Sequence, residues 1–210
     1  KRSLGLTNAL LSRARRRDIE AIRGLTDRPR SAISGNSSYT AARIGEVYGV
    51  EAGVLLPSVV SDEFPAEAGL DEVSETQDIT DPYAVSVGRA GWAKGTWETV
   101  SMLAGSGVSL AHVGGGTGED LARLTQHAES CGVGLWVAPR LSSPEMAALI
   151  RGARAVVSMA HGEPFGLTPV EAISVGTPAL MVDEGGFRDT VIDGVNGRLL
   201  PRDDLGAWHS

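Results

Sequence analysis

The chain has 210 residues, of which 42% are hydrophobic and only 5% aromatic, and it carries a formal net charge of -7. This length accommodates one large domain or two small ones, with a core built mainly from aliphatic side chains. The acidic balance argues against a broad nucleic-acid-binding surface. The single cysteine, Cys131, excludes a disulfide within the chain and is typical of a reducing cytosol.

Residues 1–29 are predicted to form an N-terminal helix and a linker. Apolar residues recur at helical intervals between Leu4 and Ile22, and Gly24 is expected to end the helix. The short polar segment that follows is predicted to connect this helix to the next domain. The sequence begins Lys1-Arg2-Ser3, without an initiator Met or a signal-peptide pattern, so we expect a fragment or a processed product.

The sequence contains no candidate membrane span, because no stretch approaches the ~18 apolar residues that a span needs. Four basic residues lie between Arg13 and Arg17. This run is interpreted as a solvated helix face, with contact to anionic lipid as the alternative. We therefore expect a cytoplasmic protein, with peripheral association at the inner membrane face as the second possibility.

From residue 30 to residue 210, short apolar runs alternate with segments of helical periodicity, and this part is predicted to be the main domain. The predicted strands are 31–34, 54–56, 83–87, 108–113, 135–137, 155–158, 179–182 and 198–200. The predicted helices are 39–48, 96–104, 119–130, 169–175 and one that begins at Pro144. Gly49 is expected to end the first helix, and Ser143 to cap another with Pro144 at its first position. Residues 61–81 are acidic and are predicted to be a loop.

This alternation of strands with helices of roughly 8–13 residues predicts an α/β fold with a parallel sheet covered on both faces. We find no internal repeat. Ligands of such sheets bind outside the carboxyl ends of the strands, so the loops that follow the predicted strands are the places to look for a site.

The first candidate site is the glycine-rich segment around Glu163 and Glu171, two carboxylates eight positions apart. Thr168 is expected to be the N-cap of the helix that follows, with Pro169 at the first helical position. Amide groups at such a helix start favour a phosphate or an electron-rich hydroxyl. For Glu171 the structural alternative is a capping box with Thr168. For Glu163 the alternative is a solvent-exposed loop acid.

The second candidate is the loop from Gly88 to Gly95, directly after a predicted strand. Its two cations, Arg89 and Lys94, stand five residues apart and could clamp a diphosphate, because Arg supplies a fork of donors and Lys a compact charge. The alternative is a solvated loop with incidental charges.

Other patterns are weaker. The segment from Gly114 to Glu119 lacks the last glycine of a dinucleotide-binding fingerprint and is interpreted as a strand-to-helix turn. His161 could bond a sugar hydroxyl or simply line its loop. The remaining histidines and Cys131 show no metal-ligand spacing, and the chain has no G-x-S-x-G elbow of a serine hydrolase.

The segment from Glu163 to Glu171 resembles the E-x7-E signature of retaining glycosyltransferases with the GT-B fold, especially family 4 and the related glycogen and sucrose synthases. Three further segments are similar to family motifs. Gly88 to Gly95 is similar to the G-R…K-G loop, and Ser34 to Gly49 to the entry helix S-x-x-x-A-x-x-I-x-x-x-Y-G-V. Gly185 to Gly197 is similar to the tail G-G-x-x-E-x-V-x-D-G-x-x-G. The resemblance covers about residues 31–201. At Asp189 the chain departs from the family, which usually has a longer Glu there.

The resemblance implies a role for each matching residue. Arg89 and Lys94 would bind the diphosphate of the donor. Glu163 would hold the donor sugar and the distal phosphate, and Glu171 would bond the ribose hydroxyls. The backbone near Arg140 and Leu141 would flank the base. The amides that would assist Glu163 belong to Phe165, Gly166, Leu167 and Thr168.

The resemblance further implies a Rossmann-like C-terminal domain of a GT-B fold that transfers a sugar from a nucleotide-diphosphate sugar to an unknown sugar, lipid or small-molecule acceptor. The chain would supply the donor-binding half and need a missing N-terminal Rossmann-like domain. No metal, cofactor or nucleic acid is expected. Two alternatives remain: a non-catalytic nucleotide-sugar-binding or assembly module that needs a separate N-terminal chain, and an unrelated domain such as a dehydrogenase half, against which the failed fingerprint argues.

Overall fold

The computed structural model describes residues 2–58, 79, 82–138 and 140–209, so almost all of the loop predicted over 61–81 lies outside the described residues. By its contacts the chain divides into two compact units, Lys1–Pro57 and Ser58–Ser210. The sequence patterns place a domain boundary after residue 29, and that boundary stays a prediction.

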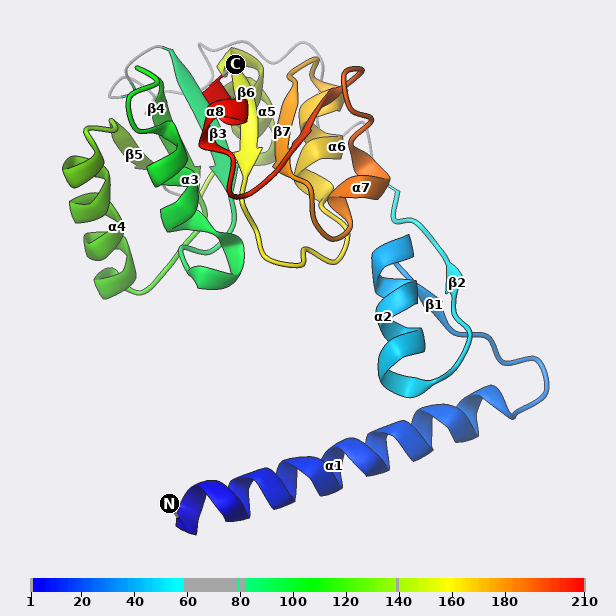
Figure 1. Ribbon diagram of the computed structural model, residues 1–210. Coiled ribbons are helices and arrows are strands. Elements are labelled where there is room, and N and C mark those ends of the chain that lie inside the picture. The colour runs from blue at the N-terminus through cyan, green and yellow to red at the C-terminus, as the bar shows by residue number, and fades with distance from the viewer. Residues whose placement is uncertain (1, 59–78, 80–81, 139, 210) are drawn as a thin grey trace. The chain divides into compact units, whose positions relative to one another are not determined.

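Unit 1 consists of a long helix and one β-α-β element (Figure 1). Helix α1 spans Arg2–Thr26 and passes through Gly24, where the predicted end was wrong, because a glycine inside a helix costs only about 1 kcal/mol. Strand β1 (Ser34–Gly35) pairs in parallel with β2 (Gly53–Val54), and α2 (Ser38–Tyr48) connects them. Of the helices that the structure describes, none is both long and apolar enough to cross a membrane.

The predicted end of α2 is confirmed, and the two predicted strands of unit 1 are shorter than expected. Gly49 follows the helix in the left-handed conformation, with φ of 67°, and its amide donates to the Gly45 carbonyl. Strands 31–34 and 54–56 were predicted from apolar runs. Pairing and not composition defines a strand, and the paired residues, 34–35 and 53–54, overlap each predicted strand at one position only, Ser34 and Val54.

Unit 2 is a six-stranded, entirely parallel sheet in the order β5-β4-β3-β6-β7-β8. Helix α3 packs against α4 and α8, and α5 packs against α6, so that the two groups cover opposite faces of the sheet (Figure 1). The predicted fold class, a Rossmann-like α/β sheet with helices on both faces, is confirmed. The strands are β3 (Tyr83–Val87), β4 (Ser109–Val113), β5 (Leu135–Ala138), β6 (Ala155–Ser158), β7 (Ala179–Val182) and β8 (Gly197–Leu200). The helices are η4 (Trp92–Lys94), α3 (Thr96–Leu103), α4 (Gly118–Cys131), α5 (Ser143–Gly152), α6 (Leu167–Ser174), α7 (Phe187–Thr190) and α8 (Leu205–His209).

The core of unit 2 lies between the sheet and its two helical layers. The central strands β3, β4 and β6 are almost fully buried, which explains why their sequences read as continuous aliphatic runs and not as alternating ones. His112 on β4 is a titratable group buried in this core, 1% exposed, and it lies 2.9 Å from the Ser86 hydroxyl. Among the described residues its Nε2 atom finds no hydrogen-bond partner.

Two predicted helix caps in unit 2 are wrong. Helix α5 is capped by Ser142 and not by Ser143: Ser142 and Glu145 form a reciprocal capping box, which places Pro144 at the second helical position. Helix α6 begins at Leu167, two residues before the predicted start at 169, and Gly166 is its N-cap. Both errors have one cause, since several polar or small residues in a row offer alternative caps and only the chain path selects one.

Candidate functional site

The strand order of unit 2 reverses between β3 and β6, which are neighbours in the sheet. Strands β4 and β5 extend the sheet to one side of β3, and strands β7 and β8 extend it on the other side of β6. In open parallel sheets such a switch point opens a crevice at the carboxyl ends of the strands, where ligands bind. The segments that follow β3 and β6, residues 88–98 and 159–166, are here called the loop junction.

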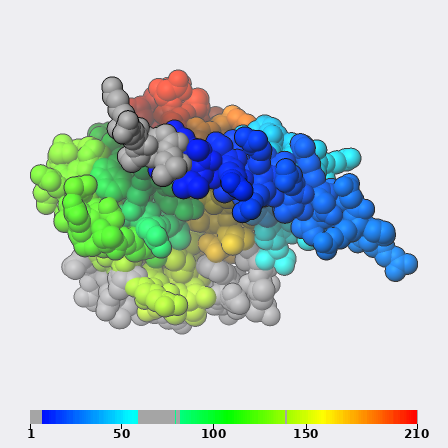
Figure 2. Space-filling view, turned by 90° about the horizontal axis from the view of Figure 1, so that it is seen from below, coloured from blue at the N-terminus to red at the C-terminus, as the bar shows by residue number. Residues whose placement is uncertain are grey.

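The two segments of the loop junction are in direct contact. The His161 amide donates to the Ala93 carbonyl at 3.0 Å. A Cβ atom at Gly95 would lie 1.9 Å from the Met159 carbonyl oxygen, and Gly95 also has a φ of 59°. Only glycine therefore fits there. In Figure 2 the green atoms that follow β3 lie beside the yellow atoms that follow β6 on this edge of the unit.

The loop junction brings together two residues that the sequence singled out separately. Lys94 Nζ donates to Glu163 Oε2 at 2.6 Å, across 69 positions of the chain. The Lys94 side chain is 40% exposed and that of Glu163 is 18% exposed. Glu163 is thus neither a free loop acid nor fully covered: it is a carboxylate with a cationic partner at the rim of the crevice.

The backbone of Glu163 is held from the other side by the turn after β7. The Gly186 amide donates to the Glu163 carbonyl at 2.7 Å. A Cβ atom at Gly185 would lie 2.5 Å from that same carbonyl oxygen, and Gly185 has a φ of 61°. The glycine pair of the sequence motif is explained by this close approach of two backbones.

A cavity of about 680 Å³ opens beside the loop junction, at the carboxyl ends of β3, β4 and β5. Its volume falls in the usual range of small-molecule sites. The structure brings Arg89, Arg140 and Leu141 together in its lining, and their roles stay predictions. The other lining residues are mostly aliphatic or glycine: Val87, Gly88, Val113, Gly114, Gly115, Leu121, Val137, Ala138 and Met146.

Glu171 lies on α6, and the capping box predicted for it is absent. Thr168 is a helical residue and the N-cap Gly166 has no side chain, so no side chain caps this helix. Burial raises the pKa of Glu171 above its usual value. A half-buried carboxylate without a capping role costs free energy unless donors reach it, and so Glu171 lacks the structural explanation that the sequence suggested.

The start of α6 presents backbone amides that have no acceptor within the helix. Gly166 has a φ of 87°, and a Cβ there would lie 2.6 Å from the ring of the buried Phe187 on α7. Phe165 is buried and anchors the turn, whereas Leu167 is 45% exposed. The amides of Phe165 to Thr168 therefore share one tight turn that begins two residues after Glu163.

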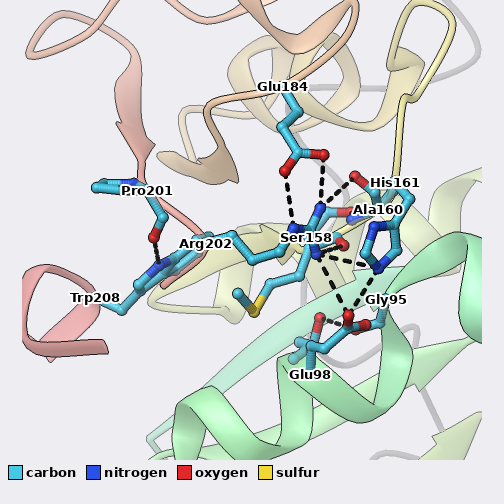
Figure 3. Close-up of polar contacts among 11 residues, drawn as sticks. Gly95, Glu98, Ser158, Ala160, His161, Glu184, Pro201, Arg202 and Trp208 are labelled. Atoms are coloured by element: carbon cyan, nitrogen blue, oxygen red, sulfur yellow. Dashed lines mark hydrogen bonds and ion pairs between the residues drawn. The ribbon is translucent and has the colours of Figure 1, made fainter. Parts of the chain in front are cut away.

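Three charged residues that the sequence patterns did not single out lie in or beside the loop junction: Glu98, Glu184 and Arg202 (Figure 3). His161 Nε2 lies 2.7 Å from Glu98 Oε1, and the His161 ring stacks on Trp92 with centroids 4.6 Å apart. His161 therefore braces the loop in the structure. Glu184 and Arg202 each follow a strand by two residues, so the rule about carboxyl ends could have identified them.

Within the part of the chain that the structure describes, no group of three or more His, Cys, Asp or Glu side chains is placed to hold a metal ion. The expectation of metal-independent chemistry stays a prediction. Asp189, the departure from the family motif, lies on the short helix α7.

The fold and the site together define a class of protein: a Rossmann-like α/β unit with a cation-lined crevice at its switch point. The chain belongs to the family Glycosyl transferases group 1, whose model matches residues 71–209. It is thus a member of a family of transferases. The predicted resemblance to glycosyltransferases of the GT-B fold is confirmed for the family and the fold.

Individual relatives agree with the family. The chain is 32% identical over 166 residues to a D-inositol 3-phosphate glycosyltransferase of Xylanimonas cellulosilytica, a match that covers 76% of this chain and 39% of that protein. The chain therefore spans well under half the length of this relative.

Solved structures show the same fold. A sucrose-phosphate synthase from Thermosynechococcus elongatus is 24% identical, with a TM-score of 0.71, over 84% of this chain and 46% of that one. The Anabaena protein HepE, solved in complex with UDP and glucose, is 17% identical, with a TM-score of 0.74, over 91% of this chain and 56% of that one.

Proposed function

We propose that this chain supplies the donor-binding half of a retaining glycosyltransferase that uses a nucleotide-diphosphate sugar. One observation carries the proposal: the Lys94–Glu163 pair stands at the switch point, next to a cavity that Arg89 and Arg140 line. Cations for a diphosphate, a carboxylate for sugar hydroxyls and an apolar space for a base therefore lie side by side.

The charges suit this ligand. A diphosphate next to Glu163 alone would suffer repulsion between like charges. Lys94, bonded to Glu163, offsets that repulsion, and Arg89 adds a forked donor from the same loop. The amide groups at the start of α6 favour the distal phosphate.

The proposed reaction places most of the catalytic effect on the leaving group. The bond between the sugar's anomeric carbon and an oxygen of the distal phosphate breaks, and the electron pair stays on the nucleoside diphosphate. The acceptor's hydroxyl oxygen bonds the same face of the sugar, and its proton passes to the departing phosphate oxygen. Lys94, Arg89 and the α6 amides would stabilise the negative charge that develops on the phosphate. Glu163 would orient the sugar through its hydroxyls, and Glu171 would accept hydrogen bonds from the ribose.

The comparisons support the donor class and the need for a second domain. HepE was solved with UDP and glucose, and the Xylanimonas relative is a glycosyltransferase in which the match covers only 39% of the length. We propose that the acceptor is bound mainly by a second domain, so that the 210 residues alone bind nucleotide and turn over little donor.

Calorimetry with UDP, GDP and ADP tests the proposal. We expect one of the three to bind, and Arg89→Ala or Lys94→Ala to weaken it by about tenfold to a hundredfold, because each removes charge-assisted bonds worth roughly 1.5–3 kcal/mol. Arg198→Ala is the matched control: Arg198 pairs with Asp193 on the surface and lies outside the lining of this cavity. Failure of all three nucleotides to bind at millimolar concentration would refute the donor site. If both variants bind the nucleotide as tightly as the wild type does, the diphosphate clamp is refuted.

A further inference from the structure

Arg202 is the most connected charged side chain near the loop junction (Figure 3). It follows β8, and its guanidinium forms a two-pronged pair with Glu184, Nε to Oε1 and Nη2 to Oε2, both at 2.8 Å. The same group donates to the Met159 carbonyl at 2.8 Å and to the Ala160 carbonyl at 3.2 Å. Glu98 Oε1 lies 3.6 Å from Nη1. One side chain therefore joins the segments that follow β6, β7 and β8 to helix α3.

Two of the segments that Arg202 joins also position Glu163: the turn after β6 carries it, and the turn after β7 bonds its carbonyl. Met159 and Ala160 begin the turn that carries Glu163, four and three positions before it. Glu184 directly precedes Gly185 and Gly186, which hold the Glu163 carbonyl from the other side. Arg202 does not touch Glu163 in any contact that the structure gives. Its bonds close a ring of contacts around the backbone that positions this carboxylate.

The surroundings fix Arg202 in turn. The Arg202 side chain is 22% exposed and two carboxylates face it, those of Glu98 and Glu184. The hydrogen bond from Arg202 holds the pKa of Glu184 below its usual value. The preceding carbonyl, that of Pro201, accepts a bond from the buried indole of Trp208 at 2.9 Å. A planar fork with five donors satisfies several acceptors in fixed directions, which a lysine ammonium cannot do.

We propose that Arg202 is a positioning residue for the sugar subsite, which holds the Glu163 carboxylate in place by tying the turn after β6 to the turn after β7. This inference rests on the proposed function, in which Glu163 orients the donor sugar. It predicts that loss of Arg202 weakens recognition of the sugar and spares recognition of the nucleoside diphosphate, because Arg89, Arg140 and the cavity lie on the other side of the switch point.

A double-mutant cycle in the complete protein tests it, with UDP and UDP-glucose as probes. Arg202→Met is expected to lower affinity for UDP-glucose about tenfold and to change affinity for UDP less than about twofold. Arg202→Lys should recover only part of the loss. In a Glu163→Gln background, Arg202→Met should cause no further loss, since it acts through Glu163. Arg198→Met is the matched control, on the strand that precedes Arg202, and loss of its surface pair should leave both affinities unchanged.

Equal loss of UDP and UDP-glucose affinity, or additive effects of the two substitutions, would overturn the proposal. If Arg202→Met fails to fold, Glu184→Gln weakens the same bonds and takes its place in the cycle. Hydrogen exchange without ligand separates this proposal from the donor assignment. Faster exchange in residues 159–166 of the Arg202→Met variant supports the positioning role even if wild type binds neither probe, and unchanged exchange there overturns it.

Discussion

The two halves of the sheet, β3 to β5 and β6 to β8, make different contributions to the same crevice. After β3, β4 and β5 the chain lines an open cavity with exposed cations and aliphatic side chains. After β6, β7 and β8 it forms turns that are bonded to one another through Arg202, Gly185 and Gly186. This division suits the ligand proposed above, a nucleotide-diphosphate sugar with a charged diphosphate at one end and a sugar of defined orientation at the other. The cations tolerate some displacement, whereas a carboxylate that aligns hydroxyls does not.

The two halves are in closest contact at Gly95, and a substitution there should destabilise the unit most. Gly95→Ala should lower the free energy of unfolding by about 4 kcal/mol, because a methyl group would strike the Met159 carbonyl and the φ of 59° adds strain. Urea denaturation measures this. Gly105→Ala is the matched control, with φ of 77° and no atom within 4 Å of its Cβ, and should cost about 1 kcal/mol. Equal losses in the two variants would show that strain alone matters at Gly95.

Burial of His112 should make the β3–β5 half sensitive to acid. Burial lowers the pKa of His112 from 6.5 to about 4. The unfolded chain therefore binds a proton at a higher pH than the folded one, and stability falls as pH drops from about 6.5 to 4, by up to about 3 kcal/mol. His112→Asn keeps a partner for Ser86 and has no group to protonate. Its unfolding free energy should fall less over this range. An identical pH dependence in wild type and variant would contradict the role of His112.

In the β6–β8 half, Glu171 is the group for which we propose that a bound ligand offsets the free-energy cost of burial. Burial raises the Glu171 pKa, so the ionised group destabilises the fold above that pKa, and the cost disappears as pH falls through it. Glu171→Gln should therefore raise the melting temperature at pH 7 and lower nucleotide affinity about tenfold. Thermal unfolding and calorimetry measure the two effects. A variant that is less stable and binds nucleotide normally would show that Glu171 has a structural role after all.

The smallest expected effect concerns α5, the helix that carries the chain from one half of the sheet to the other. Ser142→Ala removes the side chain that caps this helix with Glu145 and should cost about 1 kcal/mol. Ser143→Ala is the control and should be nearly neutral, because Ser143 is a helical residue in the first turn. Urea denaturation measures both losses. If Ser143→Ala costs more than Ser142→Ala, then Ser143 is the cap, as the sequence predicted.

Much of the site could be predicted from the sequence because its residues follow buried strands. Arg89 and Lys94 come directly after β3, and Glu163 comes shortly after β6, so the rule about carboxyl ends places all three at one edge. The assignment of the two carboxylates was harder. The pattern assigned a structural partner to Glu171 and none to Glu163, whereas the structure gives Glu163 a cation and Glu171 no cap. A three-residue spacing cannot reveal where a helix begins.

The periodicity of the elements, the parallel α/β sheet and the resemblance to the family can be predicted from the sequence, because aliphatic runs, glycines and charged loops are local features. Which loops meet becomes clear only when the strands are placed in the sheet. The Lys94–Glu163 pair spans 69 positions, and Arg202 lies 41 positions from His161 and 18 from Glu184. Such pairings depend on strand order. The adjacency of β3 and β6 follows from right-handed crossover connections that place helices on both faces of the sheet, and no local sequence pattern specifies it.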